Sequence, residues 1–366
     1  MNLRFHWMLP KGGEVSRNGP QTPREAANYR LFATRAGSPA PKPDIPGWTH
    51  FGKQAEEAGI DSLLVSFSRY EPDPILVISA LGQTTTQLRY IAAYRSGLMK
   101  PTTFVQQLNT ASAFMPGRLS INIVAGSSTA EQRGYGDYLA HDERYARAEE
   151  FLAVCNSFWK GSGDVNFEGK YYQVEQGKLH TPFFASTGSQ PEIYISGHSE
   201  PAEQLARSQA TCLLRVADTP EKLQPAVARM RKLGLEVCLR MCVISRPTRA
   251  QAVAVAESLL PDSDLGQYER SVAVKNDSQM YREASEVGKD DQSRWISPLL
   301  WKGFVPYYGP VWTTLLGSFD EVAGALLDYR RIGVTQFIMS GWPELDEVVN
   351  FGREVVPRVR RAEAQL

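Results

Sequence analysis

The stretch of residues 88–125 reads LRYIAAYRSGLMKPTTFVQQLNTASAFMPGRLSINIVA. Its apolar pattern predicts a strand over 88–94, a helix over 102–115 and a second strand over 118–125, which is rich in β-branched residues. Pro116 and Gly117 end the helix, as breakers commonly do. Two parallel strands need a crossover connection, which is usually a helix. The stretch therefore predicts one strand–helix–strand unit of a parallel sheet.

The same alternation of strand and helix continues on both sides of this unit. Further strands are expected over residues 3–9, 60–67, 192–196, 212–216, 235–245 and 335–340. Helices are expected between them, for example over 48–58, which stops at Gly59, and over 141–159. Eight such units in 366 residues predict an α/β fold, a (β/α)8 TIM barrel that forms a single domain over 1–366.

Two segments interrupt the alternation. Residues 11–47 are rich in Gly, Pro, Ser and Arg, and residues 261–319 carry several aromatic side chains. Loops of this length in a compact domain are usually functional lids or disordered. Both segments would leave the C-terminal ends of strands, where barrel enzymes place their sites, so we expect ordered lids. For the second segment, packing against another subunit is the alternative.

Composition and missing motifs exclude several classes of function. Lys and Arg number 40, as do Asp and Glu, and this balance argues against a nucleic-acid module or a polybasic membrane anchor. We find no membrane-spanning apolar segment and no signal peptide, so a cytoplasmic location is expected. The four cysteines do not make a disulfide framework. Rossmann, P-loop, HExxH and GxSxG motifs are absent, so we expect no resident nicotinamide and no metal.

Residues 196–202, SGHSEPA, follow an expected strand and open a helix. Backbone N–H groups at a helix start, flanked by small hydroxyl side chains, suit a phosphate group. The alternative is an ordinary helix start, in which Ser199 caps the helix and Pro201 occupies its first turn. Residues 141–145, HDERY, open another helix. Tyr145 there is either a phosphate neighbour or a plain core residue.

Arg240 lies in the middle of the expected strand 235–245 and shares one face with Cys238 and Cys242. Burying an arginine is unfavourable unless it meets an anion or a carboxylate, so an anion site and a structural ion pair are both open. Cys242 is either a reactive thiolate beside Arg240 or a small buried residue. Trp342, after the last strand, either stands over the barrel mouth or is an ordinary loop residue.

Several stretches, taken in order, resemble the luciferase-like superfamily of flavin-dependent monooxygenases, specifically the alkanesulfonate monooxygenase type. They are FHWMLP at 5–10, MPGR at 115–118 with NIVAGS at 122–127, ERY at 143–145 with AEEF at 148–151, SPLLWKG at 297–303 and SGWP at 340–343. The resemblance implies a TIM barrel that uses reduced FMN and O2 to oxygenate a small organic substrate. It also implies a separate NAD(P)H-dependent flavin reductase as partner, and a homo-oligomer, dimer or tetramer.

The resemblance also implies roles for individual residues. The cofactor would be bound by Tyr145, Gly197, His198, Ser199, Asn122, Ala125 and Gly126. The catalytic positions would be Arg240, Cys242 and Trp342. The substrate would be contacted by Glu71, Tyr307, Tyr308 and Glu344.

Some of these positions depart from the sulfonate-cleaving pattern. Cys242 and Glu344 stand where that pattern has histidines, Trp342 replaces a tyrosine, and Tyr308 aligns near an arginine. These changes remove positive charge, so we expect retained flavin chemistry on a larger and less anionic substrate than an alkanesulfonate. Two alternatives remain: a deazaflavin-dependent hydride-transfer oxidoreductase on the same fold, and a flavin-binding protein without turnover.

Overall fold

The computed structural model describes residues 2–10, 43–68, 71–126, 129–161, 163–260 and 293–365. The greater part of each expected lid, residues 11–42 and 261–292, lies outside these described residues. Among the helices that are described, none is long and apolar enough to cross a membrane.

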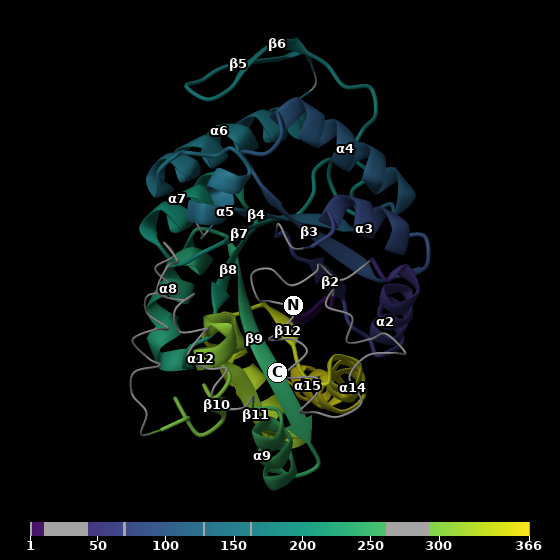
Figure 1. Ribbon diagram of the computed structural model, residues 1–366, viewed down its shortest axis with the longest axis vertical. Coiled ribbons are helices and arrows are strands. Elements are labelled where there is room, and N and C mark those ends of the chain that lie inside the picture. The colour runs from purple at the N-terminus through teal and green to yellow at the C-terminus, as the bar shows by residue number, and fades with distance from the viewer. Residues whose placement is uncertain are drawn as a thin grey trace.

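Eight parallel strands close into a barrel, as the sequence predicts (Figure 1). The strands are β1 (Arg4–Met8), β2 (Ser62–Val65), β3 (Arg89–Arg95), β4 (Leu119–Val124), β7 (Ile193–Ser196), β8 (Cys212–Val216), β9 (Glu236–Arg246) and β12 (Gln336–Ser340). Each pairs with the next along the chain, and β12 pairs with both β9 and β1, which closes the ring. The expected strands are thereby confirmed, with small differences at their ends.

Helices connect these strands and lie around the outside of the barrel (Figure 1). They are α2 (Ile45–Glu57), α3 (Pro74–Leu81), α4 (Pro101–Phe114), α5 (Thr129–Gly134), α6 (His141–Lys160), α7 (Glu200–Gln209), α8 (Pro220–Lys232), α9 (Arg249–Ser258), α13 (Phe319–Arg331), α14 (Glu344–Asn350) and α15 (Val356–Glu363). A π-helical turn, η2 (Phe351–Val355), joins the last two. Local sequence sets several starts: Thr248 and Ser318 each form a capping box with a residue three positions on.

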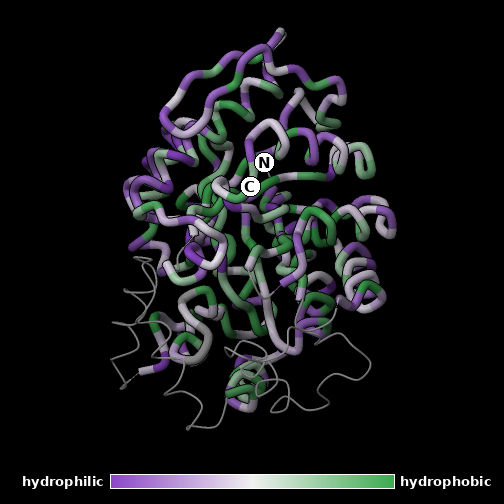
Figure 2. The backbone as a smooth tube through the Cα atoms, turned by 45° about the horizontal axis from the view of Figure 1, so that its top comes forward, coloured by the Kyte–Doolittle hydropathy of each residue, from purple (hydrophilic) through white to green (hydrophobic). Residues whose placement is uncertain are grey.

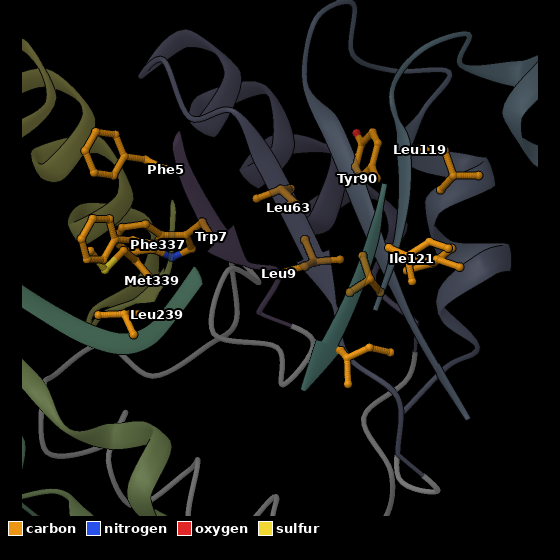
Figure 3. Packing of buried hydrophobic residues seen from close by; sticks show 14 of the residues in the cluster. Phe5, Trp7, Leu9, Leu63, Tyr90, Leu119, Ile121, Leu239, Phe337 and Met339 are labelled. Carbon is orange, nitrogen blue, oxygen red and sulfur yellow. The ribbon is translucent and has the colours of Figure 1, made fainter. Parts of the chain in front are cut away.

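Side chains alternate between the two faces of each strand, which separates two cores. Phe5 and Trp7 point outward and pack against the helices, together with Phe337 and Met339 of β12 (Figure 3). The rings of Phe5 and Phe337 lie 6.0 Å apart. His6 lies between Phe5 and Trp7 on β1. It is 1% exposed and forms a hydrogen bond with Gln336 of β12. In Figure 2, hydrophobic stretches, in green, run through the middle of the molecule, and hydrophilic ones, in purple, are more frequent at its edge.

The sheet also continues into the segment after β9, which the sequence analysis did not anticipate. Strands β10 (Leu300–Trp301) and β11 (Thr314–Ser318) extend it, with α12 (Val305–Tyr308) and the short helix η1 (Pro310–Trp312) between them. Residues 238–242 of β9 pair with β12, and residues 242–246 pair with β11. The long strand β9 therefore serves both the barrel and this extension.

A two-stranded hairpin was also not anticipated. Its strands are β5 (Val165–Glu168) and β6 (Gln173–Gly177), and it projects beyond α6 at the top of Figure 1. It forms a sheet of its own, separate from the sheet of the barrel.

Candidate functional site

A cavity of about 350 Å³ opens at the C-terminal end of the barrel strands. Met8, Val124, Ser196 and Val216, each the last residue of its strand, contribute to the wall. Barrel enzymes place their sites at this end because the loops that follow the strands meet there. Among the described residues, no cluster of His, Cys, Asp and Glu side chains is arranged to hold a metal ion.

All seven residues expected to bind a cofactor line this cavity, and so does one expected catalytic residue. The wall includes Asn122, Ala125, Gly126, Tyr145, Gly197, His198, Ser199 and Arg240. They come from three strands, β4, β7 and β9, and the loops or helices that follow the first two. The tertiary structure therefore brings together residues that lie more than a hundred positions apart in the sequence.

The start of α7 forms one corner of the cavity. Ser199 occupies the position before the first helical turn, but its side chain makes no capping hydrogen bond to that turn. The Ser199 hydroxyl instead bonds to the Tyr145 hydroxyl. The first N–H groups of any helix lack partners within the helix. Ser199 thus occupies the N-cap position with Pro201 in the first turn, as an ordinary helix start predicts, but the capping bond from its side chain is absent. The corner combines N–H groups that Ser199 does not cap with two hydroxyls.

Gly197 allows the backbone to pass through this corner. Its φ is +147°, a conformation that L side chains rarely adopt. A Cβ atom there would lie 2.7 Å from the Ala202 Cβ atom and 3.2 Å from the Tyr145 hydroxyl. Burial raises the pKa of Tyr145, opposed by its hydrogen bond to Ser199, so the phenol stays protonated at neutral pH. A protonated phenol can donate a hydrogen bond to an anion.

The turn after β4 forms the adjacent wall and is held from behind. Arg144 is 2% exposed and donates to the carbonyl oxygens of Ala125 at 3.0 Å and Gly126 at 3.3 Å. Gln132 donates to the same Ala125 oxygen at 3.0 Å. These bonds fix the carbonyls away from the cavity. Arg144 belongs to the ERY motif at 143–145, but the sequence alone predicts no role for it.

Arg240 lies on the opposite wall and is 8% exposed. It donates to the Ser340 hydroxyl at 2.9 Å and to the main-chain oxygens of Met241 at 2.6 Å and Ile338 at 3.4 Å. The Ser340 hydroxyl also lies 3.1 Å from the Cys242 sulfur, which in turn contacts the Val311 oxygen at 3.6 Å. Because Ser340 accepts from Arg240, its own proton is available to Cys242. These three hydrogen-bond partners of Arg240 are neutral, and Cys242 contacts one of them, Ser340.

Other expected residues do not line the cavity. Trp342 is 1% exposed and packs in a cluster with Cys242, Trp301 and Trp312, so it does not stand over the barrel mouth. Glu344 is buried and accepts a hydrogen bond from Trp7 at 3.4 Å. It therefore brings no negative charge to the cavity wall.

Three further residues were expected to contact the substrate: Glu71, Tyr307 and Tyr308. Glu71 accepts from the Ser66 hydroxyl at 2.9 Å and is not part of the cavity wall. The backbone of Tyr307 and Tyr308 lies in α12, but their side chains lie outside what the structure describes.

Three further wall residues with basic side chains were not predicted to belong to the site: Arg95, Arg215 and His141. Arg95 pairs with Glu131 at 2.6 Å, and Arg215 pairs with Glu203 at 2.7 Å. With Arg240, the wall thus carries three arginines, of which Arg95 and Arg215 are paired with carboxylates. A basic side chain at the end of an apolar strand, as at Arg95, is a signal that could have pointed to the rim.

Comparisons with known proteins identify a family and a shared fold. A sequence model of the luciferase-like monooxygenases matches residues 17–336. A riboflavin lyase (RcaE), solved with modified FMN and riboflavin, superposes with a TM-score of 0.75 at 16% identity, covering 99% of this chain and 92% of that one. EDTA monooxygenase from Chelativorans sp. BNC1 gives a TM-score of 0.75 at 18% identity, covering 99% and 94%.

A third solved structure uses a different cofactor. An F420-dependent secondary alcohol dehydrogenase, in complex with an F420-acetone adduct, gives a TM-score of 0.65 at 16% identity and covers 98% of this chain and all of that one. At these identities the likeness shows a shared fold.

Proposed function

The chain belongs to the luciferase-like monooxygenase family, and on that premise we propose that it is a flavin-dependent monooxygenase. It uses reduced FMN, delivered by a separate NAD(P)H-dependent flavin reductase, and O2 to oxygenate a small organic substrate. The observation that carries the proposal is the meeting of the α7 corner and Arg240 in one cavity at the strand ends. We expect the protein to act in the cytoplasm as a homo-oligomer.

The residues of the α7 corner fit the phosphate of FMN. Ser199 leaves the first turn of α7 uncapped, and Gly197 keeps the approach open where a Cβ atom would collide. An anion at a helix start is stabilised by the helix dipole and the free N–H groups. Tyr145 and Ser199 would add two hydroxyl donors, and Asn122, Ala125 and Gly126 would line the space beside the flavin ring.

Arg240 would supply preorganised positive charge where the reaction takes place. When bound, reduced FMN supplies the electrons that activate O2 for transfer of one oxygen atom. Arg240 is buried and already oriented by Ser340, so it needs no rearrangement to stabilise a developing negative charge. The apolar wall residues Met8, Leu64 and Leu214 exclude water from the same space.

Flavin binding and oxygen use test the proposal together. We expect anaerobic titration with reduced FMN to show saturable binding, and oxygen uptake with reductase and NADH to yield an oxygenated product with a suitable substrate. Binding of reduced deazaflavin F420 with hydride transfer and no oxygen uptake would instead establish the alternative on this fold. Tight FMN binding that yields only hydrogen peroxide would indicate a flavin-binding protein without turnover.

Ser199→Ala is expected to weaken FMN binding by about tenfold, the effect of losing one hydrogen bond to a charged group. The free energy of unfolding should change by less than about 0.5 kcal/mol, because this side chain caps nothing. Fluorescence titration and urea denaturation measure the two effects. Thr248→Ala is the matched control, since Thr248 caps α9: it should lose about 1 kcal/mol and leave FMN binding unchanged.

Ser340→Ala is expected to lower turnover by about tenfold, because it removes the hydroxyl that orients the Arg240 guanidinium. FMN affinity should stay within about twofold, since Ser340 is not part of the cavity wall. Ser340→Thr retains the hydroxyl and should recover most of the activity. Steady-state turnover and FMN titration of all three proteins provide the measurement. An equal loss in the Ala and Thr variants would assign Ser340 a packing role instead.

A further inference from the structure

Arg95, the last residue of β3, lines the cavity while being only 6% exposed. One guanidinium nitrogen, NH2, donates to Glu131 at 2.6 Å. Its other two nitrogens, Nε and NH1, are buried and have no hydrogen-bond partner among the residues that the structure describes. Buried side-chain donors in folded proteins nearly always have a partner, and arginine cannot lose its proton to avoid the need.

The guanidinium of Arg95 is also held in place. It lies 5.2 Å from the ring centre of Phe67 and 5.7 Å from that of Tyr135. These cation–π contacts and the bond to Glu131 restrict its orientation. Phe67 lines the same cavity. Arg95 is therefore a fixed cation in the cavity wall, with two buried donors that no described residue satisfies.

The barrel topology places Arg95 away from both features already assigned a role. The strand order β3-β4-β7-β8-β9 puts Arg95 and Arg240 on opposite sides of the ring, with β7 and the α7 corner between them. The phosphate of FMN would occupy the α7 corner, so Arg95 remains available to a second group. Beside Arg95 the wall is apolar, formed by Phe67, Leu64 and Met8.

We propose that Arg95 binds an oxyanion on the organic substrate, of the carboxylate or sulfonate class, while the apolar wall contacts its carbon skeleton. This inference rests on the proposed function and names the substrate class of that site. It replaces the sequence-based expectation of a less anionic substrate. The other possible anionic partner of Arg95 is the reduced flavin ring itself. Measuring the affinity for FMN separately from the affinity for the substrate anion distinguishes the two.

The test uses octanoate and octanol, which share a carbon chain and differ in charge. We expect the FMN-loaded wild-type protein to bind octanoate at least tenfold more tightly than octanol in calorimetric titrations. Arg95→Met should abolish this preference and leave the affinity for FMN within threefold. Arg147→Met is the matched control, because Arg147 makes a partly buried ion pair with Asp137 at 2.6 Å but is not part of the cavity wall. It should keep the preference.

The other possible results of these titrations contradict either the proposed anion site or the proposed function. No preference in the wild type, or a preference that persists in Arg95→Met, overturns the proposal. Loss of FMN affinity with the preference retained would assign Arg95 to the flavin and also overturns it. If the wild type does not bind FMN, the proposed function fails, and the same titrations without FMN still test the anion site. Arg95→Lys serves as a second variant if Arg95→Met does not fold. Lysine retains the charge but lacks the planar fork of donors, so the preference for octanoate should fall severalfold. An unchanged preference would contradict the proposal.

Discussion

Arg240→Ala is expected to lower turnover by about a hundredfold or more, the scale measured when one preorganised donor is removed from an active site. Arg240 is 8% exposed, lies on the cavity wall, and is oriented by Ser340 and two main-chain oxygens. A charge fixed in this way stabilises developing negative charge without first reorganising water. Its removal therefore acts on the transition state more than on binding of the ground state.

Turnover number, FMN affinity and thermal unfolding of the variant together measure this effect. We expect kcat to fall while FMN affinity changes little, because the phosphate corner lies on β7 and α7 rather than on β9. Arg240→Lys keeps the charge but not the planar fork, so partial recovery is expected. A folded Arg240→Ala protein with normal turnover would leave Arg240 only a structural role.

The second large expected effect is on the pH dependence of stability, and it depends on Glu347. This residue of α14 is 0% exposed, pairs with Arg246 and accepts a bond from the Ser245 amide at 3.3 Å. Burial raises the pKa of Glu347 to about 7 from an ordinary value of 4.5, and Arg246 only partly opposes this. Between these two pH values the folded protein holds a proton that the unfolded chain releases. Stability contributed by Glu347 is therefore lost as pH rises from about 4.5 through 7.

Glu347→Gln removes this titration while keeping an acceptor for Ser245 and Arg246. We expect the free energy of unfolding of the variant, relative to wild type, to increase by about 3 kcal/mol between pH 4 and pH 8. Urea denaturation at intervals across this range measures the difference. Parallel pH curves for the two proteins would show that Glu347 does not titrate there.

Glu321→Gln is the matched control of opposite sign. Hydrogen bonds from Ser318 and the charge of Arg249 lower the pKa of Glu321 despite its partial burial. Its stabilising contribution is present above the ordinary pKa and is lost as pH falls through the lowered value. The variant should therefore lose stability relative to wild type as pH rises, opposite to Glu347→Gln.

The barrel was predictable because each strand is a short apolar run bounded by helix signals. Residues 88–125 already contain one complete parallel unit, whose two strands, β3 and β4, pair in the structure. β11 was missed because five residues between irregular segments carry little periodicity of their own. It is a strand because β9 extends beyond the barrel and offers its backbone groups as partners.

The candidate site was predictable where it depends on strand ends. Ser199 and Arg240 share the cavity because the C-terminal ends of all parallel barrel strands meet at one rim. Trp342 and Glu344 lie just past such an end, yet they turn into the core beside it. Which way a side chain points after a strand depends on packing with distant segments, here Trp312 and Trp7.

The sequence by itself determined the barrel, the order of its strands and the rim on which the functional residues gather, because these follow from local apolar patterns and a repeated connection. Only the tertiary structure decided which charges face the cavity. Arg95 meets Glu131 across 36 positions, and Arg240 meets Ser340 across 100. Such partners become neighbours only when the barrel closes, and a buried arginine's remaining donors cannot be known before its partners are.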